Sequence, residues 1–250
     1  MKSIAWDIWL YCNYDCNFCN SKTVIFPKEL KTAKELIEVW EKVYKKYGRC
    51  RIYITGGEPF LYPSFIDIIV KLSKFHDLHI TTNLSFNIDE LINLNIRRDC
   101  LFINVTFHPF YQEIYKFVNK VRILKENGYK ISVTYMSDDL QMTELLNYKN
   151  IFLKNNITFS PVETNCNEAR NNAVKDFLIS GFEKKEDSEV SRKSLCNAGY
   201  KYLVVNNIGD IFICSMNKNK IGNMFVDGLN FLSKKIFCDK ECILSEKKYY

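Results

Sequence analysis

Cys12-Asn-Tyr-Asp-Cys16-Asn-Phe-Cys19 follows an apolar run that begins near Ile4, and Ile54-Thr-Gly-Gly-Glu-Pro59 ends a second such run. Three thiolates on one tight loop can hold a four-iron cluster through three irons only, because such clusters usually take four cysteines. The remaining iron then lacks a protein ligand, and a vacant position of this kind distinguishes catalytic from closed structural metal sites. The same loop could instead supply three ligands to zinc, with the fourth coming from elsewhere.

The glycine-rich segment favours the cluster over zinc. Gly56 and Gly57 allow backbone to approach a ligand closely, and the Glu58 carboxylate can meet the amino group of a methionine. Together the two motifs resemble those of the radical S-adenosylmethionine superfamily. The resemblance implies a [4Fe-4S] cluster on the three cysteines, whose open iron chelates S-adenosylmethionine.

The resemblance also implies further contacts to S-adenosylmethionine. The glycines and Glu58 would contact its amino end, Pro59 would shape the turn, and the Phe18 backbone would meet adenine. Asn83 and Thr106 lie at or near strand ends, where the superfamily places polar groups against the methionyl carboxylate and ribose; ordinary strand capping is the alternative. The implied cofactor-binding residues are Phe18, Gly56, Gly57, Glu58, Pro59, Asn83 and Thr106.

The reaction implied by the resemblance is a radical one. Electron donation into S-adenosylmethionine, from a flavodoxin- or ferredoxin-type protein, would release methionine and a 5′-deoxyadenosyl radical that abstracts hydrogen from a substrate. The cofactor carries this chemistry, and the protein supplies orientation and excludes water and oxygen. Oxygen sensitivity is expected.

The fold class follows from the order of the apolar segments. Short runs rich in Ile, Val, Thr and aromatic residues alternate with longer amphipathic segments, which predicts repeated βα units and a parallel sheet. Six such units predict an α/β fold with a partial (β/α)6 barrel that is open at one side, as in the superfamily. The strands are expected near Ile4 to Tyr11, Arg51 to Thr55, Leu78 to Thr82, Leu101 to Phe107, Lys130 to Tyr135 and Ile157 to Pro161.

Two residues on loops after strands are candidates for work on the substrate. His108 follows the fourth strand and has an ordinary pKa suited to proton transfer, so it could bind the substrate or remove its proton. Glu163 follows the sixth strand and could bind a hydroxyl or amine. The alternatives are a hydrogen-bonded loop histidine and a solvated loop acid. His76 and His79, at the start of the third strand, are expected to be structural.

A second group of cysteines lies near the C-terminus. Cys196 precedes and Cys214 ends a predicted β-hairpin whose turn contains Gly209, and Cys238 and Cys242 follow. Four thiolates could hold zinc or a complete cluster, and spacing alone does not choose. The arrangement resembles the twitch domain, a shortened SPASM domain, and this implies one auxiliary [4Fe-4S] cluster that transfers electrons.

These features predict a division of the chain and a reaction. Residues 1–182 would form the barrel, 183–195 a linker, and 196–250 a small hairpin and helix domain for the auxiliary cluster. A nearby electron acceptor suits a net oxidation, so the leading hypothesis is dehydrogenation of a small polyhydroxylated or sugar-like molecule. The alternatives are a maturase that modifies a ribosomally made peptide and a non-catalytic zinc-binding scaffold.

Composition excludes other classes. The net charge of +6 is modest, and no basic stripe with interleaved aromatic residues indicates nucleic-acid binding. No apolar run is long enough for a membrane span, and no secretory signal is evident, so a cytoplasmic enzyme is expected. The ten cysteines therefore indicate metal or cluster binding rather than disulfides. Cys50, Cys100 and Cys166 are expected to be small buried residues without a role in the chemistry.

Overall fold

The computed structural model describes residues 1–16, 19, 29–136, 142–162, 194–215 and 219–238. Six consecutive strands run parallel and in chain order along one curved sheet. Each predicted strand is confirmed, within two residues at both ends. The strands are β1 (Ser3–Trp9), β2 (Arg51–Gly56), β3 (Asp77–Thr82), β4 (Leu101–Phe107), β5 (Lys130–Met136) and β6 (Phe159–Val162).

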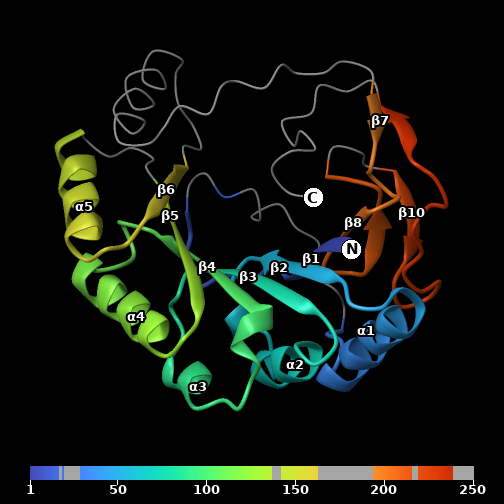
Figure 1. The fold of residues 1–250 in the computed structure, drawn as a ribbon, viewed down its shortest axis with the longest axis horizontal. Coiled ribbons are helices and arrows are strands. Elements are labelled where there is room, and N and C mark those ends of the chain that lie inside the picture. The colour runs from blue at the N-terminus through green and yellow to red at the C-terminus, as the bar shows by residue number, and fades with distance from the viewer. Residues whose placement is uncertain (17–18, 20–28, 137–141, 163–193, 216–218, 239–250) are drawn as a thin grey trace.

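The helices lie on the convex face of this sheet, which gives the chain the α/β partial-barrel fold (Figure 1). Residues that alternate along each strand, such as Ile52 and Ile54 of β2, are fully buried towards the helices. Trp6 of β1 packs on Trp40 with ring centroids 5.2 Å apart. The helices are α1 (Ala33–Tyr47), α2 (Phe65–Leu72), α3 (Asp89–Ile92), α4 (Ile114–Glu126) and α5 (Met142–Lys154), with short 3-10 turns η2 (Pro59–Leu61) and η3 (Arg98–Cys100).

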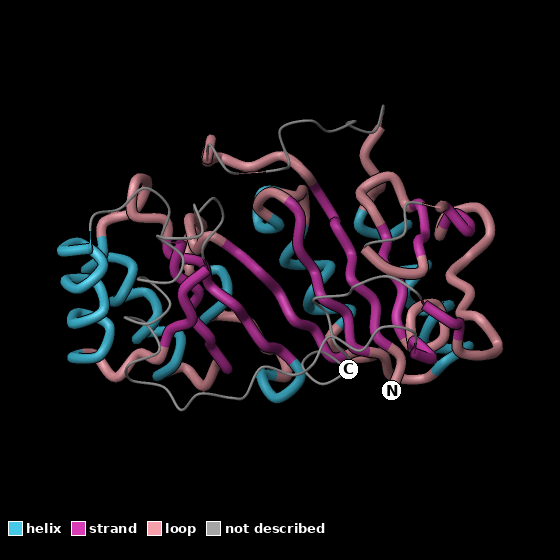
Figure 2. Tube along the Cα trace, turned by 90° about the horizontal axis from the view of Figure 1, so that it is seen from above, coloured by secondary structure: helices cyan, strands magenta, loops and turns pink. Residues whose placement is uncertain are grey.

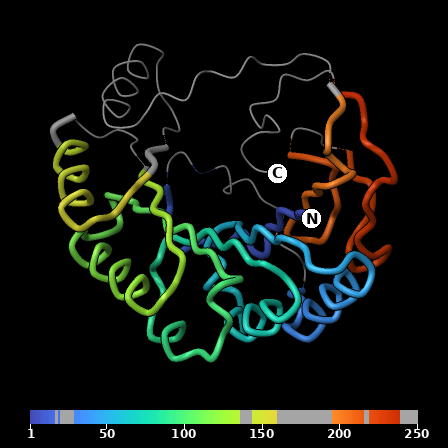
Figure 3. The backbone as a smooth tube through the Cα atoms, viewed as in Figure 1, coloured from blue at the N-terminus to red at the C-terminus, as the bar shows by residue number. Residues whose placement is uncertain are grey.

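The C-terminal strands extend the same sheet. β8 (Tyr202–Val205) pairs in parallel with β1, and β9 (Asp210–Phe212) and β10 (Lys220–Asn223) follow as antiparallel neighbours. Figure 3 shows the orange C-terminal strands beside the blue N-terminal one, and Figure 2 shows the strands fanned across the sheet. The hairpin predicted around Gly209 is confirmed by β8 and β9. The sequence did not indicate its pairing with β1.

A separate two-stranded ribbon consists of β7 (Ser194–Cys196) and β11 (Ile236–Cys238). The helix expected in this C-terminal part is not seen among residues 194–215 and 219–238. No helix among the described residues is long and apolar enough to cross a membrane. Cys50 and Cys100 are buried, as predicted, whereas Cys166 lies outside the described residues.

The start of α1 is fixed by a capping box between Thr32 and Glu35. The Thr32 hydroxyl accepts from the Glu35 backbone N–H at 3.2 Å, and a Glu35 carboxylate oxygen accepts from the Thr32 N–H at 2.8 Å. These bonds satisfy donors that a helix leaves free at its first turn. The hydrogen bond from the Thr32 N–H, together with that from Lys31, lowers the pKa of Glu35 to about 2.

We expect the contribution of Glu35 to stability to depend on pH. A carboxyl whose pKa is depressed in the folded state stabilises the fold above its unfolded pKa of 4.5, and this stabilisation is lost as the pH falls towards 2. The difference in unfolding free energy between wild type and Glu35→Ala should therefore be full at neutral pH and shrink between about pH 4.5 and 2. Denaturant unfolding across this range measures it. Glu35→Gln, which keeps an acceptor without a charge, is the control, and a wild-type–Ala difference that is constant with pH would contradict the prediction.

Candidate active site

The Gly-Gly-Glu-Pro segment is bound directly to the chain that leads into the first cysteine. The Gly57 N–H donates to the Trp9 carbonyl at 2.7 Å, and the Glu58 N–H donates to the Tyr11 carbonyl at 2.9 Å. The register of β1 and β2 shifts between Asp7 and Trp9, so two residues of β1 face one of β2. This bulge turns the chain from the end of β1 towards the cysteine loop. The two sequence motifs are therefore one structural unit.

Glu58 is fully buried and its carboxylate accepts three hydrogen bonds. The donors are the Phe60 N–H at 3.0 Å, the Thr82 hydroxyl at 2.8 Å and the Asn83 N–H at 2.7 Å. Burial raises the pKa of Glu58, although the three hydrogen bonds oppose this shift. The carboxylate thus joins the end of β2 to the end of β3 and positions Asn83. A contact of Glu58 with the amino group of S-adenosylmethionine remains a prediction.

A cavity of about 170 Å³ lies at the carboxyl ends of the strands. In α/β barrels this end is where catalytic residues gather. The cavity brings together most of the described residues that the sequence predicted for the cofactor, together with His108. It is lined by Cys12, Tyr14, Cys16, Cys19, Thr55, Gly56, Gly57, Thr81, Thr82, Asn83, Thr106 and His108.

The three cysteines face this cavity in different surroundings. Cys16 is buried, whereas Cys12 and Cys19 are partly exposed, and the Cys19 N–H donates to the Cys16 carbonyl at 3.1 Å. Among the described residues, no three Cys, His, Asp or Glu side chains converge on a point that would hold a single metal ion. A four-iron cube does not require such convergence, because each cysteine binds a different iron. Three thiols around one cavity fit such a cluster.

Asn83 lies between the cysteine loop and β3. Its side-chain NH2 group donates to the side-chain Oδ1 of Asn13 at 3.0 Å and lies 3.7 Å from the Cys12 sulfur. Burial raises the pKa of the Cys12 thiol, and the hydrogen bonds from the Tyr14 N–H and from Asn83 oppose this effect by favouring the thiolate. Asn83 therefore favours the thiolate form of Cys12 and lines the same cavity. Its contact with S-adenosylmethionine remains a prediction.

We expect Asn83→Ala to weaken binding of S-adenosylmethionine. A hydrogen bond to a charged group contributes about 1.5 to 3 kcal/mol, so the KM for S-adenosylmethionine should rise about tenfold or more. Steady-state cleavage assays under anaerobic conditions measure this change. Asn93→Ala is the control, because Asn93 caps the exposed α3, with its amide donating to the Asp89 carbonyl. Equal KM values for wild type and Asn83→Ala would contradict the assignment.

His108 lies against Cys16. Its Nδ1 is 3.6 Å from the Cys16 sulfur, and its backbone N–H donates to Gln112 at 2.8 Å. Tyr14 packs edge-on against the imidazole and stacks on Tyr111 with centroids 4.6 Å apart. Burial lowers the pKa of His108 to about 4, so the ring is neutral at pH 7. The ordinary pKa assumed from the sequence is not retained, and a role of His108 towards the substrate remains a prediction.

Other predicted site residues lie elsewhere. Cys196 and Cys238 are on one face of the β7–β11 ribbon, because Cys196 is opposite Ile236, two residues before Cys238. Cys214 follows β9 and lies near Tyr202. Burial of Tyr202 and, as the second largest cause, the charge of Cys214 raise the pKa of Tyr202 to about 12. Phe18, Glu163 and Cys242 lie outside the described residues.

Tyr14 and Thr55 line the cavity but are not predicted as site residues by the sequence. Thr55 could have been found from the alternation of β2, since it shares a face with Tyr53 and not with the buried Ile54. Tyr14 lies between two of the cysteines in sequence. No pattern in a short loop indicates which side chains face a ligand.

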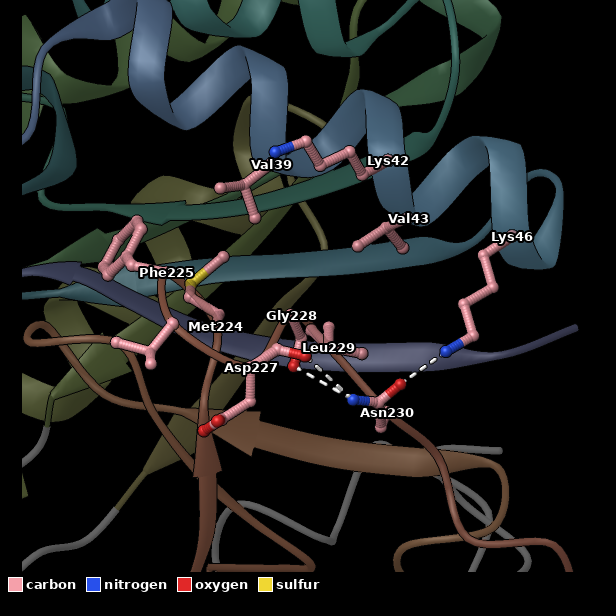
Figure 4. A pocket seen from close by; sticks show the side chains of 11 residues that line it. Val39, Lys42, Val43, Lys46, Met224, Phe225, Asp227, Gly228, Leu229 and Asn230 are labelled. Carbon is pink, nitrogen blue, oxygen red and sulfur yellow. Dashed lines mark hydrogen bonds between the residues drawn. The ribbon is translucent and has the colours of Figure 1, made fainter.

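A larger cavity, of about 250 Å³, lies between α1 and residues 224–230 (Figure 4). Its polar side chains are Lys42, Lys46, Asp227 and Asn230, and Lys46 donates to Asn230. It contains no cysteine or histidine and opens on the helix side of the sheet. We interpret it as an imperfectly packed contact by which the C-terminal segment rests on α1, not as the active site.

The match to known families agrees with this geometry. Residues 7–136, about half of the chain, match the Radical SAM superfamily, and the protein belongs to this superfamily. The matched range includes all three cysteines of the loop, the glycine segment and His108. As a member, the chain is a radical S-adenosylmethionine enzyme that uses a [4Fe-4S] cluster and S-adenosylmethionine. The thiols and polar side chains around the cavity fit both.

Curated relatives include a probable GTP 3′,8-cyclase of Archaeoglobus fulgidus, 28% identical over 58% of this chain and 53% of its own length. A GTP 3′,8-cyclase of Staphylococcus haemolyticus is 30% identical over 50% of this chain and 40% of its own. The chain thus spans about half the length of the curated relatives it matches.

Among solved structures, Streptococcus suis SuiB bound to the precursor peptide SuiA is similar with a TM-score of 0.65 at 16% identity, over 91% of this chain and 63% of SuiB. The structure of anSMEcpe with bound AdoMet has a TM-score of 0.61 at 12% identity, over 89% and 74%. At these identities the likeness shows the fold.

Proposed function

We propose that the protein oxidises a small polyhydroxylated or sugar-like molecule, with an auxiliary [4Fe-4S] cluster in its C-terminal part accepting one electron. When bound, the first cluster and S-adenosylmethionine supply the radical that removes a hydrogen atom from the substrate. The residues of this chain bind and orient that substrate and exclude water. A flavodoxin- or ferredoxin-type protein would supply the electron that starts the reaction.

The observation that supports this proposal best is the polar inner face of the sheet. Hydroxyl, amide and carboxylate groups on neighbouring strands occupy the positions that face away from the helices and towards the open side. Such groups can pair with several hydroxyls of one compact substrate. They include Asp7, Thr55, Thr81, Asn104, Ser132 and Thr134. The curated relatives are named for GTP, a small molecule that contains a sugar, which agrees with a substrate of this class.

The C-terminal cysteines support the second part of the proposal. Cys196 and Cys238 are diagonal neighbours on one face of the antiparallel ribbon. Diagonal neighbours of this kind typically lie about 7 to 8 Å apart, with a somewhat shorter distance between their Cβ atoms. This separation suits two irons of one cluster better than a single zinc ion. Cys242 would be a further ligand, and we propose residues 196–250 as the part that binds the auxiliary cluster, after a barrel of residues 1–182 and a linker of residues 183–195.

The experiment is anaerobic reconstitution followed by turnover with polyols and aminocyclitols deuterated at each carbinol carbon. We expect about eight irons per chain, since each cluster holds four. Deuterium should move from one labelled carbon into 5′-deoxyadenosine, and a ketone should form at that carbon. Transfer only from a peptide would favour a peptide maturase instead. Bound zinc without cleavage of S-adenosylmethionine would exclude both reactions.

A further inference from the structure

One residue from each of five neighbouring strands occupies the same level of the inner face. The register pairs Asp7 with Thr55, Thr81 with Asn104, and Asn104 with Ser132. Thr55 and Thr81 follow the paired Ile54 and Ile80, so they share this level too. We call this set the floor layer: Asp7, Thr55, Thr81, Asn104 and Ser132.

The floor layer borders the cavity of about 170 Å³ that the three loop cysteines line. Thr55 and Thr81 line that cavity. The preceding residue of β1, Trp6, packs on Trp40 of α1, so alternation directs the neighbouring Asp7 to the opposite, inner face. The Asp7 carboxylate is therefore one strand away from a residue that contacts the cofactor cavity.

Asp7 is the one carboxylate of the floor layer. Among the described residues, no hydrogen bond or cation is found at its carboxylate, and burial raises its pKa. Two tyrosines of the neighbouring strands share its face: Tyr53 of β2 pairs with Ala5, and Tyr202 of β8 pairs with Ser3. Burial, then the charges of Cys214 and Asp7, raise the pKa of Tyr202. A half-buried carboxylate without a donor is costly, so such a group is usually kept for a ligand.

Asn104 offers a hydrogen-bond donor, whereas the Asp7 carboxylate offers an acceptor. Its carbonyl oxygen accepts from the Ser132 hydroxyl at 2.7 Å and from the Thr134 hydroxyl at 3.0 Å. These two bonds fix the amide so that its NH2 group is the donor end. Asp7 and Asn104 are three strands apart, which is about 14 Å measured along the sheet. Because the sheet is curved, the straight-line distance across its concave face is shorter. An acceptor and a donor at this separation can bind both ends of a sugar-sized molecule.

We propose that Asp7 binds the hydroxyl of the carbon that is oxidised and accepts its proton, while Asn104 orients the far side of the substrate. This inference rests on the proposed function. When bound, S-adenosylmethionine would supply the radical that takes one hydrogen atom from the carbinol C–H, which leaves 5′-deoxyadenosine. The hydroxyl proton goes to the Asp7 carboxylate, and one electron goes to the auxiliary cluster. The C–O bond becomes a carbonyl, and the substrate loses two hydrogens in total.

The test compares Asp7→Asn with wild type in anaerobic turnover of a deuterated polyol substrate. Loss of a general base typically costs about 100-fold or more. Asparagine keeps an oxygen that accepts from the substrate hydroxyl but cannot take its proton. With the substrate at a saturating concentration, we therefore expect Asp7→Asn still to transfer deuterium into 5′-deoxyadenosine but to form about 100-fold less ketone per 5′-deoxyadenosine. A carbon-centred radical should accumulate in its electron paramagnetic resonance spectrum. Asp7→Glu should recover part of the ketone, which a merely structural role would not explain.

The control is Asp67→Asn, which removes an exposed carboxylate from the outer surface of α2. Iron content and circular dichroism establish that each variant is folded and loaded, and Asp7→Glu serves for the comparison if Asp7→Asn is not. An unchanged ketone ratio in Asp7→Asn, or loss of deuterium transfer together with ketone, overturns the assignment of Asp7 as proton acceptor while the proposed function stands. A wild-type protein that cleaves S-adenosylmethionine but takes deuterium from no polyol overturns both.

Discussion

Replacing Cys16 with serine should remove about four irons from the reconstituted chain and reduce cleavage of S-adenosylmethionine to background, while the fold survives. A cube held by three cysteines already has one iron without a protein ligand. Loss of one of the three cysteines would leave two irons without a protein ligand. Cys16 is the buried one of the three, at 8% exposure, and its sulfur lies 3.6 Å from His108. The measurements are iron and sulfide content after anaerobic reconstitution, and 5′-deoxyadenosine formed with dithionite.

The chain offers a closely matched control in Cys100→Ser. Cys100 has 6% exposure, and its thiol donates to the Arg97 and Ser73 carbonyls, bonds that a serine hydroxyl can also make. It is the last residue of η3 and does not line the cavity. This variant should load iron and cleave S-adenosylmethionine like wild type. If both serine variants lost iron equally, general destabilisation would explain the result, and the cysteine loop would not be the cluster site.

Most of the barrel could be predicted because its signals are local. Alternation of apolar residues along β2 and β3 and the capping box at Thr32 depend on residues that are close in sequence. The order of βα units then fixes a parallel sheet. The position of the cysteines and glycines at strand ends follows from the same order, so their meeting at one cavity was predictable as well.

The remaining features depend on contacts between distant parts of the chain. The parallel pairing of β8 with β1 joins residues about 200 positions apart, such as Ser3 and Tyr202, and no local pattern specifies it. The same limit applies to His108, since its pKa depends on burial by other segments. That no described residue donates a hydrogen bond to the Asp7 carboxylate is also visible only once the strands are assembled. The sequence indicates which residue types meet at the carboxyl edge of the sheet, whereas their burial in the folded chain shifts their pKa values.

Replacing Gly56 with alanine should lower the free energy of unfolding by about 3 kcal/mol or more, because strain of overpacking and of unusual backbone angles each cost about 1 to 3 kcal/mol. A Cβ at Gly56 would lie 1.9 Å from the Trp9 carbonyl oxygen, and φ is +135°. The opposing atoms are backbone and cannot rotate away. For a chain of this size, a midpoint shift of about 6 to 12 °C should follow. Thermal unfolding of the protein as purified measures it.

Gly48→Ala separates the two causes of this loss. Gly48 also has a positive φ, of +71°, but nothing lies within 4 Å of its added Cβ. With ψ at −159°, it should cost only the penalty for a backbone conformation that is essentially restricted to glycine, about 1 to 3 kcal/mol. Equal losses at both positions would show that the clash with β1 contributes nothing.

A larger loss at Gly56 would mean that this glycine is required by the bulge between Asp7 and Trp9, independently of any ligand. The paired glycines of the motif then serve first to bring the β2 loop against the carbonyls of Trp9 and Tyr11, since a Cβ at Gly57 would likewise lie 2.2 Å from the Tyr11 oxygen. That contact sets where the chain leaves β1, and so where Cys12 begins the loop. Iron loading should therefore fall in Gly56→Ala even at temperatures where it stays folded, and remain normal in Gly48→Ala.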